Sequence, residues 1–154
     1  MKDRKNKSHR TPIDSGYESC ESTYVEFLVY IDNEEASYIT KVLDIVPSKS
    51  QTRGDLVENS RGLKRTAKST YWILSSEEKV LSKDLRHHLN WLLDQLTSRQ
   101  FQLSRLQNDD AVSMTVNCLW WSRGSGGPTL WPEQMRKLSA LNLECTFDFY
   151  LDDS

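Results

Sequence analysis

The sequence Tyr24-Val25-Glu26-Phe27-Leu28-Val29-Tyr30-Ile31 sets the architecture of this chain. Apolar residues alternate along it, so one side of an extended backbone carries Val25, Phe27, Val29 and Ile31, and the other side carries Tyr24, Glu26, Leu28 and Tyr30. A period of two is typical of a β-strand with one face in a hydrophobic core. The stretch therefore predicts a strand whose second face displays two tyrosines and a carboxylate.

Further elements of both kinds follow this strand. Helical spacing of apolar residues predicts a short helix that ends before Pro47, a long helix that starts near Ser82, and a helix that begins at Pro132. Alternating residues predict strands over 70–74, 113–121 and 143–151. The order predicts an α+β fold, specifically a ferredoxin-like two-layer sandwich in which a four-stranded, mainly antiparallel sheet carries three helices on one face.

Composition divides the 154 residues into an arm and one domain. Residues 1–22 have almost no apolar content, which predicts a disordered arm because such a segment buries too little surface to offset its ordering entropy. Residues 23–151 are predicted to form a single α+β domain. Within it, residues 48–68 are polar and hold six Lys or Arg against two acidic residues, and a connection of this length is either functional or mobile.

Charge, apolar content and cysteine usage exclude several partners and settings. The formal net charge of -2 gives no overall attraction to nucleic acid or to an anionic membrane surface. No apolar run approaches the roughly 20 residues that span a bilayer, and the N-terminus lacks the apolar core of a signal peptide. The three cysteines show no metal-ligand spacing, which is typical of reduced thiols. We therefore expect a soluble protein of the cytoplasm that has no nucleic-acid or membrane partner.

No combination of residues predicts catalysis or metal binding. The adjacent His87 and His88 point about 100° apart on a helix, so they cannot chelate one metal ion together. The nucleophile elbow, the zinc-protease motif and the phosphate-binding P-loop are absent, although the glycine-rich turn 123–128 has the flexibility of an anion-binding loop. We predict no catalytic residue, no metal ligand and no cofactor.

The second face of the predicted sheet is the candidate binding surface. It combines aromatic side chains with carboxylates at Tyr24, Glu26, Tyr30, Trp72, Trp121, Asp148 and Tyr150. Exposed Tyr and Trp favour recognition because they combine a large apolar area with a polar group. The carboxylates repel phosphate and favour a basic protein partner. Two alternatives stay open, in which the long loop or a second copy of the chain covers this face.

Several short segments form a more specific pattern than composition does. They are Pro47-Ser48-Lys49 with the residues up to Gly54, Trp72-Ile73-Leu74-Ser75-Ser76, Leu89-Asn90-Trp91-Leu92-Leu93-Asp94-Gln95-Leu96, Gly126-Gly127-Pro128, and the closing strand from Leu143 to Tyr150. Together they resemble a bacterial family described as domain of unknown function 4279, over about residues 24–151. The resemblance implies a soluble bacterial domain with no established activity, and it carries over no catalytic residue.

Three functions compete at this point. The leading expectation is a binding protein of the immunity type, which neutralises a basic toxin through the acidic, aromatic face. The alternative is a small-ligand-binding protein or an enzyme with a pocket between the loop 49–68 and the turn 123–128. The third is a homodimer that has no other partner.

Overall fold

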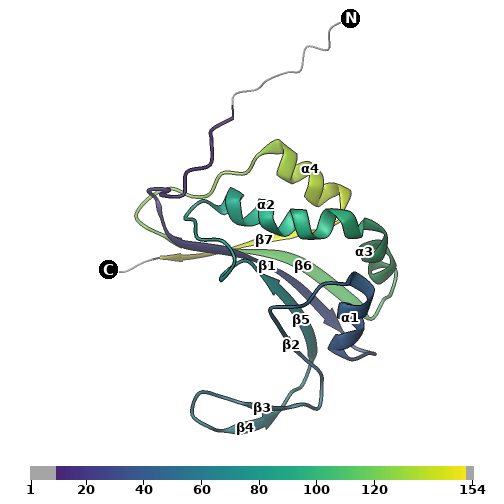
Figure 1. The fold of residues 1–154 in the computed structure, drawn as a ribbon. Coiled ribbons are helices and arrows are strands. Elements are labelled where there is room, and N and C mark those ends of the chain that lie inside the picture. Colours follow the sequence, from purple (N-terminus) through teal and green to yellow (C-terminus); the bar gives the residue numbers. More distant parts are fainter. Residues whose placement is uncertain (1–9, 152–154) are drawn as a thin grey trace, which may run out of the picture.

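The fold is an α+β arrangement of two sheets and a helical layer, described for residues 10–151 by a computed structural model (Figure 1). Five strands form the main sheet in the order β2-β5-β1-β6-β7, and β3 and β4 form a separate two-stranded sheet. The elements in chain order are β1 (Cys20–Ile31), α1 (Ala36–Leu43), β2 (Lys49–Gln51), β3 (Leu56–Glu58), β4 (Lys64–Thr66), β5 (Thr70–Ser75), α2 (Leu85–Leu96), the 3-10 helix η1 (Thr97–Arg99), α3 (Gln100–Gln107), β6 (Val112–Ser122), α4 (Pro132–Ala140) and β7 (Cys145–Leu151).

The strand β1 occupies the centre of the main sheet. It pairs antiparallel with β5, where Leu28 lies opposite Ile73, and antiparallel with β6, where Leu28 lies opposite Thr115. The strand β2 adds to the outer side of β5, and β7 adds parallel to β6 after the crossover through α4. The sheet is therefore mixed, and the predicted α+β class is confirmed.

The hydrophobic core lies between the main sheet and the helices. Val25, Phe27 and Val29 of β1 are fully buried, as their alternation predicts. The helix α2 contributes a row of leucines that are also fully buried: Leu85, Leu89, Leu92, Leu93 and Leu96. Full burial of one such side chain contributes roughly 1.5–3 kcal/mol. The contact between sheet and helices is thus a main source of stability.

Three details differ from the predicted sandwich. The sheet has five strands rather than four, because the three residues of β2, which polar composition assigned to a loop, pair with β5. The long predicted helix begins at Leu85 after its N-cap Asp84 and is interrupted by η1 before α3. A ferredoxin-like arrangement is not confirmed, because helices follow β1, β5 and β6 in turn, whereas a ferredoxin-like unit joins its two middle strands directly.

The structure also differs from the predicted disordered arm over residues 10–22, which lie against the domain; the rest of that arm falls outside the described residues. Arg86 on α2 donates a hydrogen bond to the carbonyl oxygen of Thr11 at 2.7 Å. The carboxylate of Asp84 accepts one from the backbone N–H of Asp14 at 2.8 Å. The buried side chains of Asp84 and Arg86 thus hold this segment in place through hydrogen bonds. The prediction of disorder rested on the low apolar content of the segment, which does not reveal hydrogen bonds of this kind.

The polar stretch 48–68 forms β2 and the β3–β4 hairpin. Every residue of β4 is exposed, and Leu56 in β3 is 78% exposed. Backbone hydrogen bonds close the base of the hairpin, from Gly54 N–H to Ala67 O at 2.9 Å and from Ala67 N–H to Asp55 O at 2.8 Å. Figure 1 shows the hairpin beyond the ends of β2 and β5, apart from β1, β6 and β7. The hairpin therefore does not cover the second sheet face.

Candidate functional site

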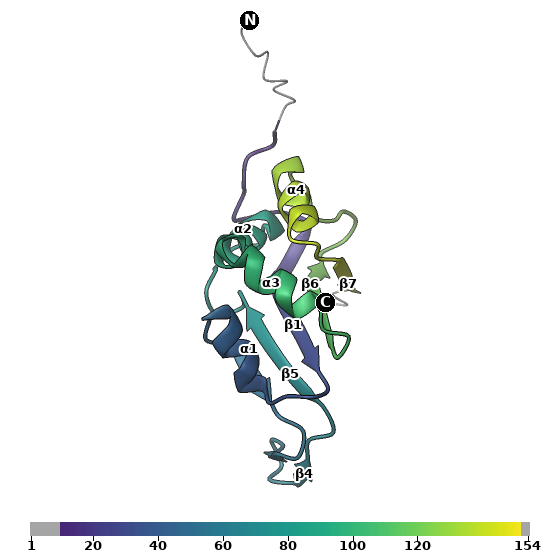
Figure 2. The same cartoon turned by 90° about the vertical axis from the view of Figure 1, so that its right-hand side faces the viewer.

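The sheet face opposite the helices, named the open face, carries most of the residues predicted to bind a partner. Figure 2 shows α1 and α2 on one side of the strands, and the open face is the other side. Its residues alternate with the core residues along each strand: Tyr24, Glu26, Leu28 and Tyr30 on β1, Tyr71 and Ile73 on β5, Asn117, Leu119 and Trp121 on β6, and Asp148 and Tyr150 on β7. Tyr30 is 44% and Tyr150 is 43% exposed, so the face is accessible at both places.

Three aromatic rings from three strands form a continuous stack on the open face. The ring centres of Tyr24 and Trp121 are 5.7 Å apart, with 27° between the ring planes. Those of Trp121 and Tyr150 are 4.7 Å apart, with 16° between the planes. Stacking at these distances is favourable for aromatic rings. The strand register produces the stack, since Trp121 lies beside Tyr150 in the β6–β7 pair.

Two of the predicted binding residues lie away from this stack. The ring of Tyr30 meets Tyr71 edge-on at 6.4 Å, near the far end of β1. Trp72 points into the core with 0% exposure, and its indole N–H donates to Thr40 Oγ1 at 3.0 Å. The prediction that Trp72 belongs to the binding face is wrong. Large apolar residues occupy both sides of β5, so alternation alone could not tell which side meets the helices.

Glu26 lies at the centre of the open face. Burial raises the pKa of its carboxyl, and the carboxylates of Glu77 and Asp148 raise it as well, while Lys49 opposes them. Burial, with the charges of Glu77 and Glu26, raises the pKa of Tyr24 to about 12, so this phenol keeps its proton at neutral pH. The open face therefore combines aromatic rings with an excess of negative charge.

Asn117 and Asp148 form a polar link next to Glu26. The amide Nδ2 of Asn117 donates to Asp148 Oδ2 at 3.0 Å. The other amide atom, Asn117 Oδ1, is buried and has no hydrogen-bond partner among the described residues. Glu26 lies directly opposite Asn117 in the β1–β6 pair. Acceptor oxygens thus gather here, and a cation with several N–H donors would complement them.

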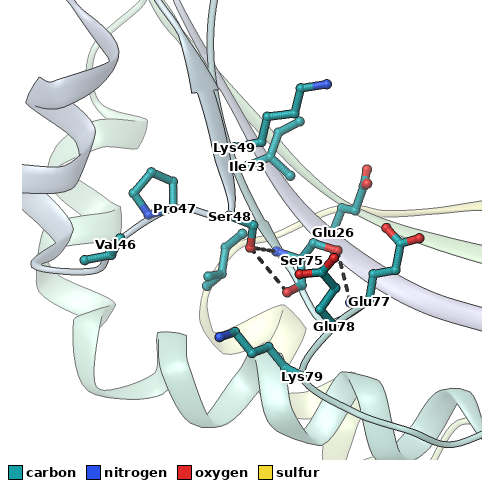
Figure 3. Close-up of a pocket in the computed structure, with 11 residues that line it drawn as sticks. Glu26, Val46, Pro47, Ser48, Lys49, Ile73, Ser75, Glu77, Glu78 and Lys79 are labelled. Carbon is teal, nitrogen blue, oxygen red and sulfur yellow. Dashed lines mark hydrogen bonds between the residues drawn. The ribbon is translucent and has the colours of Figure 1, made fainter. Parts of the chain in front are cut away.

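A cavity of about 540 Å³ opens at the rim of the open face, where β2 begins and β5 ends (Figure 3). Figure 3 shows the charged side chains around it, which are Glu26, Lys49, Glu77, Glu78 and Lys79. The two strand ends are joined by Ser48, whose hydroxyl oxygen accepts from the backbone N–H of Ser75 at 2.9 Å. The cavity is polar and carries both signs of charge.

The structure does not bring together the two segments of the predicted alternative pocket. The segment 49–68 lies at the β2 edge of the sheet, whereas the turn 123–128 follows β6 and meets the start of β1. In this turn Gly126 has a φ of +129°, and a Cβ atom there would lie 2.6 Å from the Cβ of Ser19. Glycine is needed at this position because the backbone approaches the N-terminal segment closely.

Other buried polar side chains have structural roles. His88 is 1% exposed, with Nδ1 2.7 Å from Ser76 Oγ and Nε2 2.8 Å from Ser82 O, and burial lowers its pKa. The thiols of Cys118 and Cys145 lie 3.5 Å apart on the core side of β6 and β7. Within residues 10–151, no cluster of three or more His, Cys, Asp or Glu side chains is placed to hold a metal ion. In the same range, no helix combines the length and apolar character needed to cross a membrane.

The strand register adds residues that the sequence did not single out. Leu119 is 8% exposed and lies between Tyr24 on β1 and Asp148 on β7. Glu77 follows β5 and acts on Glu26 through its charge. The alignment of strands from distant parts of the chain brings these residues together, and no local sequence signal indicates that alignment.

Fold and site define an α+β domain with a mixed five-stranded sheet, whose open face carries an aromatic stack beside carboxylates. The family model described as Domain of unknown function (DUF4279) matches residues 21–152. The chain therefore belongs to this family, which confirms the resemblance in the sequence. No curated protein and no solved structure matches the chain.

Proposed function

We propose that the chain is a non-catalytic binding protein that captures a basic protein partner on the open face. The observation that carries this proposal is the stack of Tyr24, Trp121 and Tyr150 close to Glu26 and Asp148. A planar guanidinium can stack on an aromatic ring and can also donate paired hydrogen bonds to a carboxylate. An Arg-bearing segment of a partner would find both kinds of group on this face.

A basic protein fits the open face better than a nucleic acid does. Sheets that bind RNA by stacking its bases need Lys and Arg near their aromatic residues, because these hold the phosphates. Here Glu77 and Asp148 add negative charge around Glu26, and Lys49 offsets part of it. Such a surface repels a phosphate backbone and speeds the encounter with a basic protein.

The biological role that suits this surface is neutralisation of a basic toxin. In that role the chain is an immunity-type protein of the bacterial cytoplasm that covers the working surface of its toxin. The family match assigns no activity. Support for the role therefore comes from the acidic and aromatic character of the open face.

Affinity capture from a lysate of the native host tests the proposal. Wild-type protein is compared with the double variant Glu26→Gln/Tyr150→Ala, which removes the central carboxylate and the exposed ring at the end of the stack. The control is Phe101→Ala, because Phe101 is 71% exposed on α3 in the helical layer. We expect a basic protein that binds wild type and control alike. With the purified partner, the double variant should raise the Kd about 30-fold or more, as the loss of a binding hot spot does.

Two results would count against this function. One is that folded wild-type protein recovers no basic partner at physiological salt. The other is a partner that binds the double variant as tightly as the wild type. Circular dichroism and thermal unfolding establish that each variant is folded before affinities are compared.

The cavity in Figure 3 supports a second candidate, which is recognition of a small zwitterionic ligand. Lys49 and Lys79 line it together with Glu77 and Glu78, and its volume of about 540 Å³ is typical of small-molecule sites. A thermal-shift screen with amino acids, nucleotides and phosphorylated metabolites tests this candidate, since a ligand at about 100 times its Kd stabilises the native state by roughly 2.7 kcal/mol. A shift that Lys79→Ala abolishes would assign the ligand to the cavity, and a screen without any shift would remove the candidate.

A further inference from the structure

The two edges of the main sheet differ in how they are protected. The strand β2 forms one edge, is three residues long, follows Pro47 closely and carries Lys49. Short length, Lys and Pro are features by which edge strands avoid pairing with other chains. The strand β7 forms the other edge, is seven residues long, and contains no Lys, Arg or Pro. Of these two edges, β7 is the one that another strand can join.

The outer backbone groups of β7 are free to pair. The carbonyl oxygen of Glu144 accepts a hydrogen bond from Val116 N–H at 2.9 Å, so even-numbered residues here direct their backbone groups toward β6. These groups alternate in direction along a strand, and Phe147, Phe149 and Leu151 therefore direct theirs outward. No backbone hydrogen bond joins these outward groups to another residue of the described range 10–151.

The same residues expose apolar side chains. Phe149 is 59% exposed and Leu151 is 80% exposed. The rings of Phe147 and Phe149 stack at 6.1 Å, with 10° between their planes. Figure 1 shows the end of β7 extending past the helices. An exposed apolar strand with free backbone groups is a site for strand addition.

We propose that β7 pairs antiparallel with β7 of a second copy of this chain, which joins the two five-stranded sheets into one. In the register centred on Phe149, this residue lies opposite its own equivalent, and Phe147 lies opposite Leu151 of the second copy. On the open face, Asp148 lies opposite Tyr150 of the second copy. The strand complements itself in this register, because apolar side chains meet each other and each carboxylate meets a phenol hydroxyl that can donate to it.

Charge disfavours one neighbouring register and does not call for a basic partner. A register centred on Asp148 would place two carboxylates opposite each other, which is destabilising. In the register centred on Phe149, no carboxylate of residues 145–151 faces another one. Asp148 is the one charge on the strand and already accepts a hydrogen bond from Asn117, so the edge does not require a basic partner. Pairing about a two-fold axis is closed and ends at a dimer.

Dimerisation would extend the open face across two copies. Asp148 and Tyr150 of the second copy would lie next to the end of the aromatic stack, on the same continuous sheet surface. The inference does not depend on the proposed function, since a monomer can still capture a basic protein and a dimer can form without one. Affinity capture tests partner binding and sedimentation tests dimerisation, so a failure of one proposal is distinguishable from a failure of the other.

Sedimentation equilibrium of the full chain tests the pairing. The mass of the wild type should rise from that of the 17.9 kDa monomer toward twice that value as the concentration increases from micromolar to near-millimolar. Phe149→Lys and Leu151→Lys should each raise the dimer Kd about tenfold or more, because the substitution occurs twice in each dimer. Phe101→Lys, at an apolar position on α3 whose exposure of 71% lies between those of Phe149 and Leu151, should leave the Kd unchanged. If Phe149→Lys disturbs the packing of Phe149 on Phe147, Leu151→Lys still tests the pairing, because Leu151 takes no part in that contact.

A cross-link tests the register. Directly opposed hydrogen-bonded residues of an antiparallel pair have Cα atoms about 5.5 Å apart, which a disulfide can span. Two Phe149→Cys chains should therefore form one intermolecular disulfide and reduce one glutathione disulfide to two glutathiones, whereas Phe101→Cys chains should not. A wild type that stays monomeric at every concentration would overturn the proposal. So would a dimer that neither lysine variant weakens, or a Phe101→Cys chain that cross-links as fast as Phe149→Cys.

Discussion

Glu26 is placed where its charge disfavours the folded state. Burial and the carboxylates of Glu77 and Asp148 raise the pKa of its carboxyl above the ordinary value. A carboxyl with a raised pKa binds protons more tightly in the folded chain than in the unfolded chain, so its ionisation destabilises the fold. A residue that lowers stability and lies among exposed aromatic rings is typical of a binding site.

Glu26→Gln should therefore stabilise the protein at neutral pH, by about 1 kcal/mol, because glutamine keeps the size and polarity of the side chain and removes the charge. The sign follows from the raised pKa: the wild type loses stability as the pH rises from the unfolded-state value of about 4.3 through the folded-state value. The advantage of the variant should be full at neutral pH and should vanish as the pH falls below about 4. Urea unfolding at both pH values measures it.

The matched control for this prediction is Glu78→Gln, because Glu78 lies at the rim of the same cavity and is exposed. It removes the same charge from the chain and should change the free energy of unfolding by less than about 0.5 kcal/mol. If Glu26→Gln were less stable than wild type at neutral pH, the carboxylate of Glu26 would be a stabilising group and this interpretation of the open face would be wrong.

Among the elements, the β3–β4 hairpin stands apart from the core. Its strands are three residues each, and an isolated two-stranded hairpin is marginally stable in water. Replacing residues 56–66 with Asn-Gly keeps the backbone hydrogen bond from Ala67 N–H to Asp55 O within reach of a tight turn. We expect the free energy of unfolding to fall by less than about 1 kcal/mol, measured by urea unfolding.

Trp72→Ala in the adjacent β5 is the contrasting variant. Trp72 is fully buried, so its truncation should cost about 3–5 kcal/mol. If the hairpin replacement were as damaging as Trp72→Ala, the hairpin would be part of the cooperative fold. Partner capture that survives the replacement would also show that this basic segment takes no part in binding.

Some of these elements could be predicted from the sequence because one face alone is apolar. In β1 a tyrosine or a carboxylate occupies three of the four positions that alternate with Val25, Phe27, Val29 and Ile31, and the structure buries the expected side. In β5 both sides are apolar, so Trp72 was assigned to the wrong side. The strand β2 has three polar residues and becomes a strand through its pairing with β5. The sequence of β2 alone gives no sign of this pairing.

The sequence predicted many of the residues that lie on the binding face, but not how these residues are arranged on it. Alternation placed Tyr24, Trp121 and Tyr150 on the same sheet face, as the structure does. Their stacking depends on the register between β1, β6 and β7, which is set by contacts between distant parts of the chain. For the same reason Tyr30 was grouped with them, although the structure places it against Tyr71.

In the whole molecule, residues 10–19 are part of the folded unit. Asp84 and Arg86 form an ion pair at 2.7 Å with side chains 0% and 2% exposed, and Thr11 covers it. Burial alone would raise the pKa of Asp84, but hydrogen bonds from the Arg86 side chain and from two backbone N–H groups outweigh burial and lower it. A lowered pKa means that this carboxylate stabilises the fold above its unfolded-state pKa of about 3.9, and that the stabilisation is lost as the pH falls through the folded-state pKa.

A chain that begins at Cys20 should therefore be less stable than one that begins at Arg10, by about 3 kcal/mol. The deletion removes the carbonyl acceptors of Arg86, each worth about 1.5–3 kcal/mol to a charged donor, and the ring of Tyr17 that meets Trp120 edge-on at 5.4 Å. Urea unfolding of the two chains at neutral pH measures the difference. A segment that is disordered in solution would instead change the free energy of unfolding by less than about 0.5 kcal/mol.

Arg86→Lys separates the role of the ion pair from that of the segment as a whole. The planar guanidinium of Arg86 donates to the Asp84 carboxylate and to the Thr11 carbonyl at the same time, which a lysine ammonium cannot reproduce. The substitution should therefore destabilise the longer chain by about 3 kcal/mol. In the shorter chain the same substitution should cost clearly less, because the acceptors in the segment are already gone. The difference between the two costs is the coupling between Arg86 and residues 10–19. Equal costs in both chains would mean that Arg86 stabilises α2 alone, and that the segment is held by Tyr17 and its neighbours.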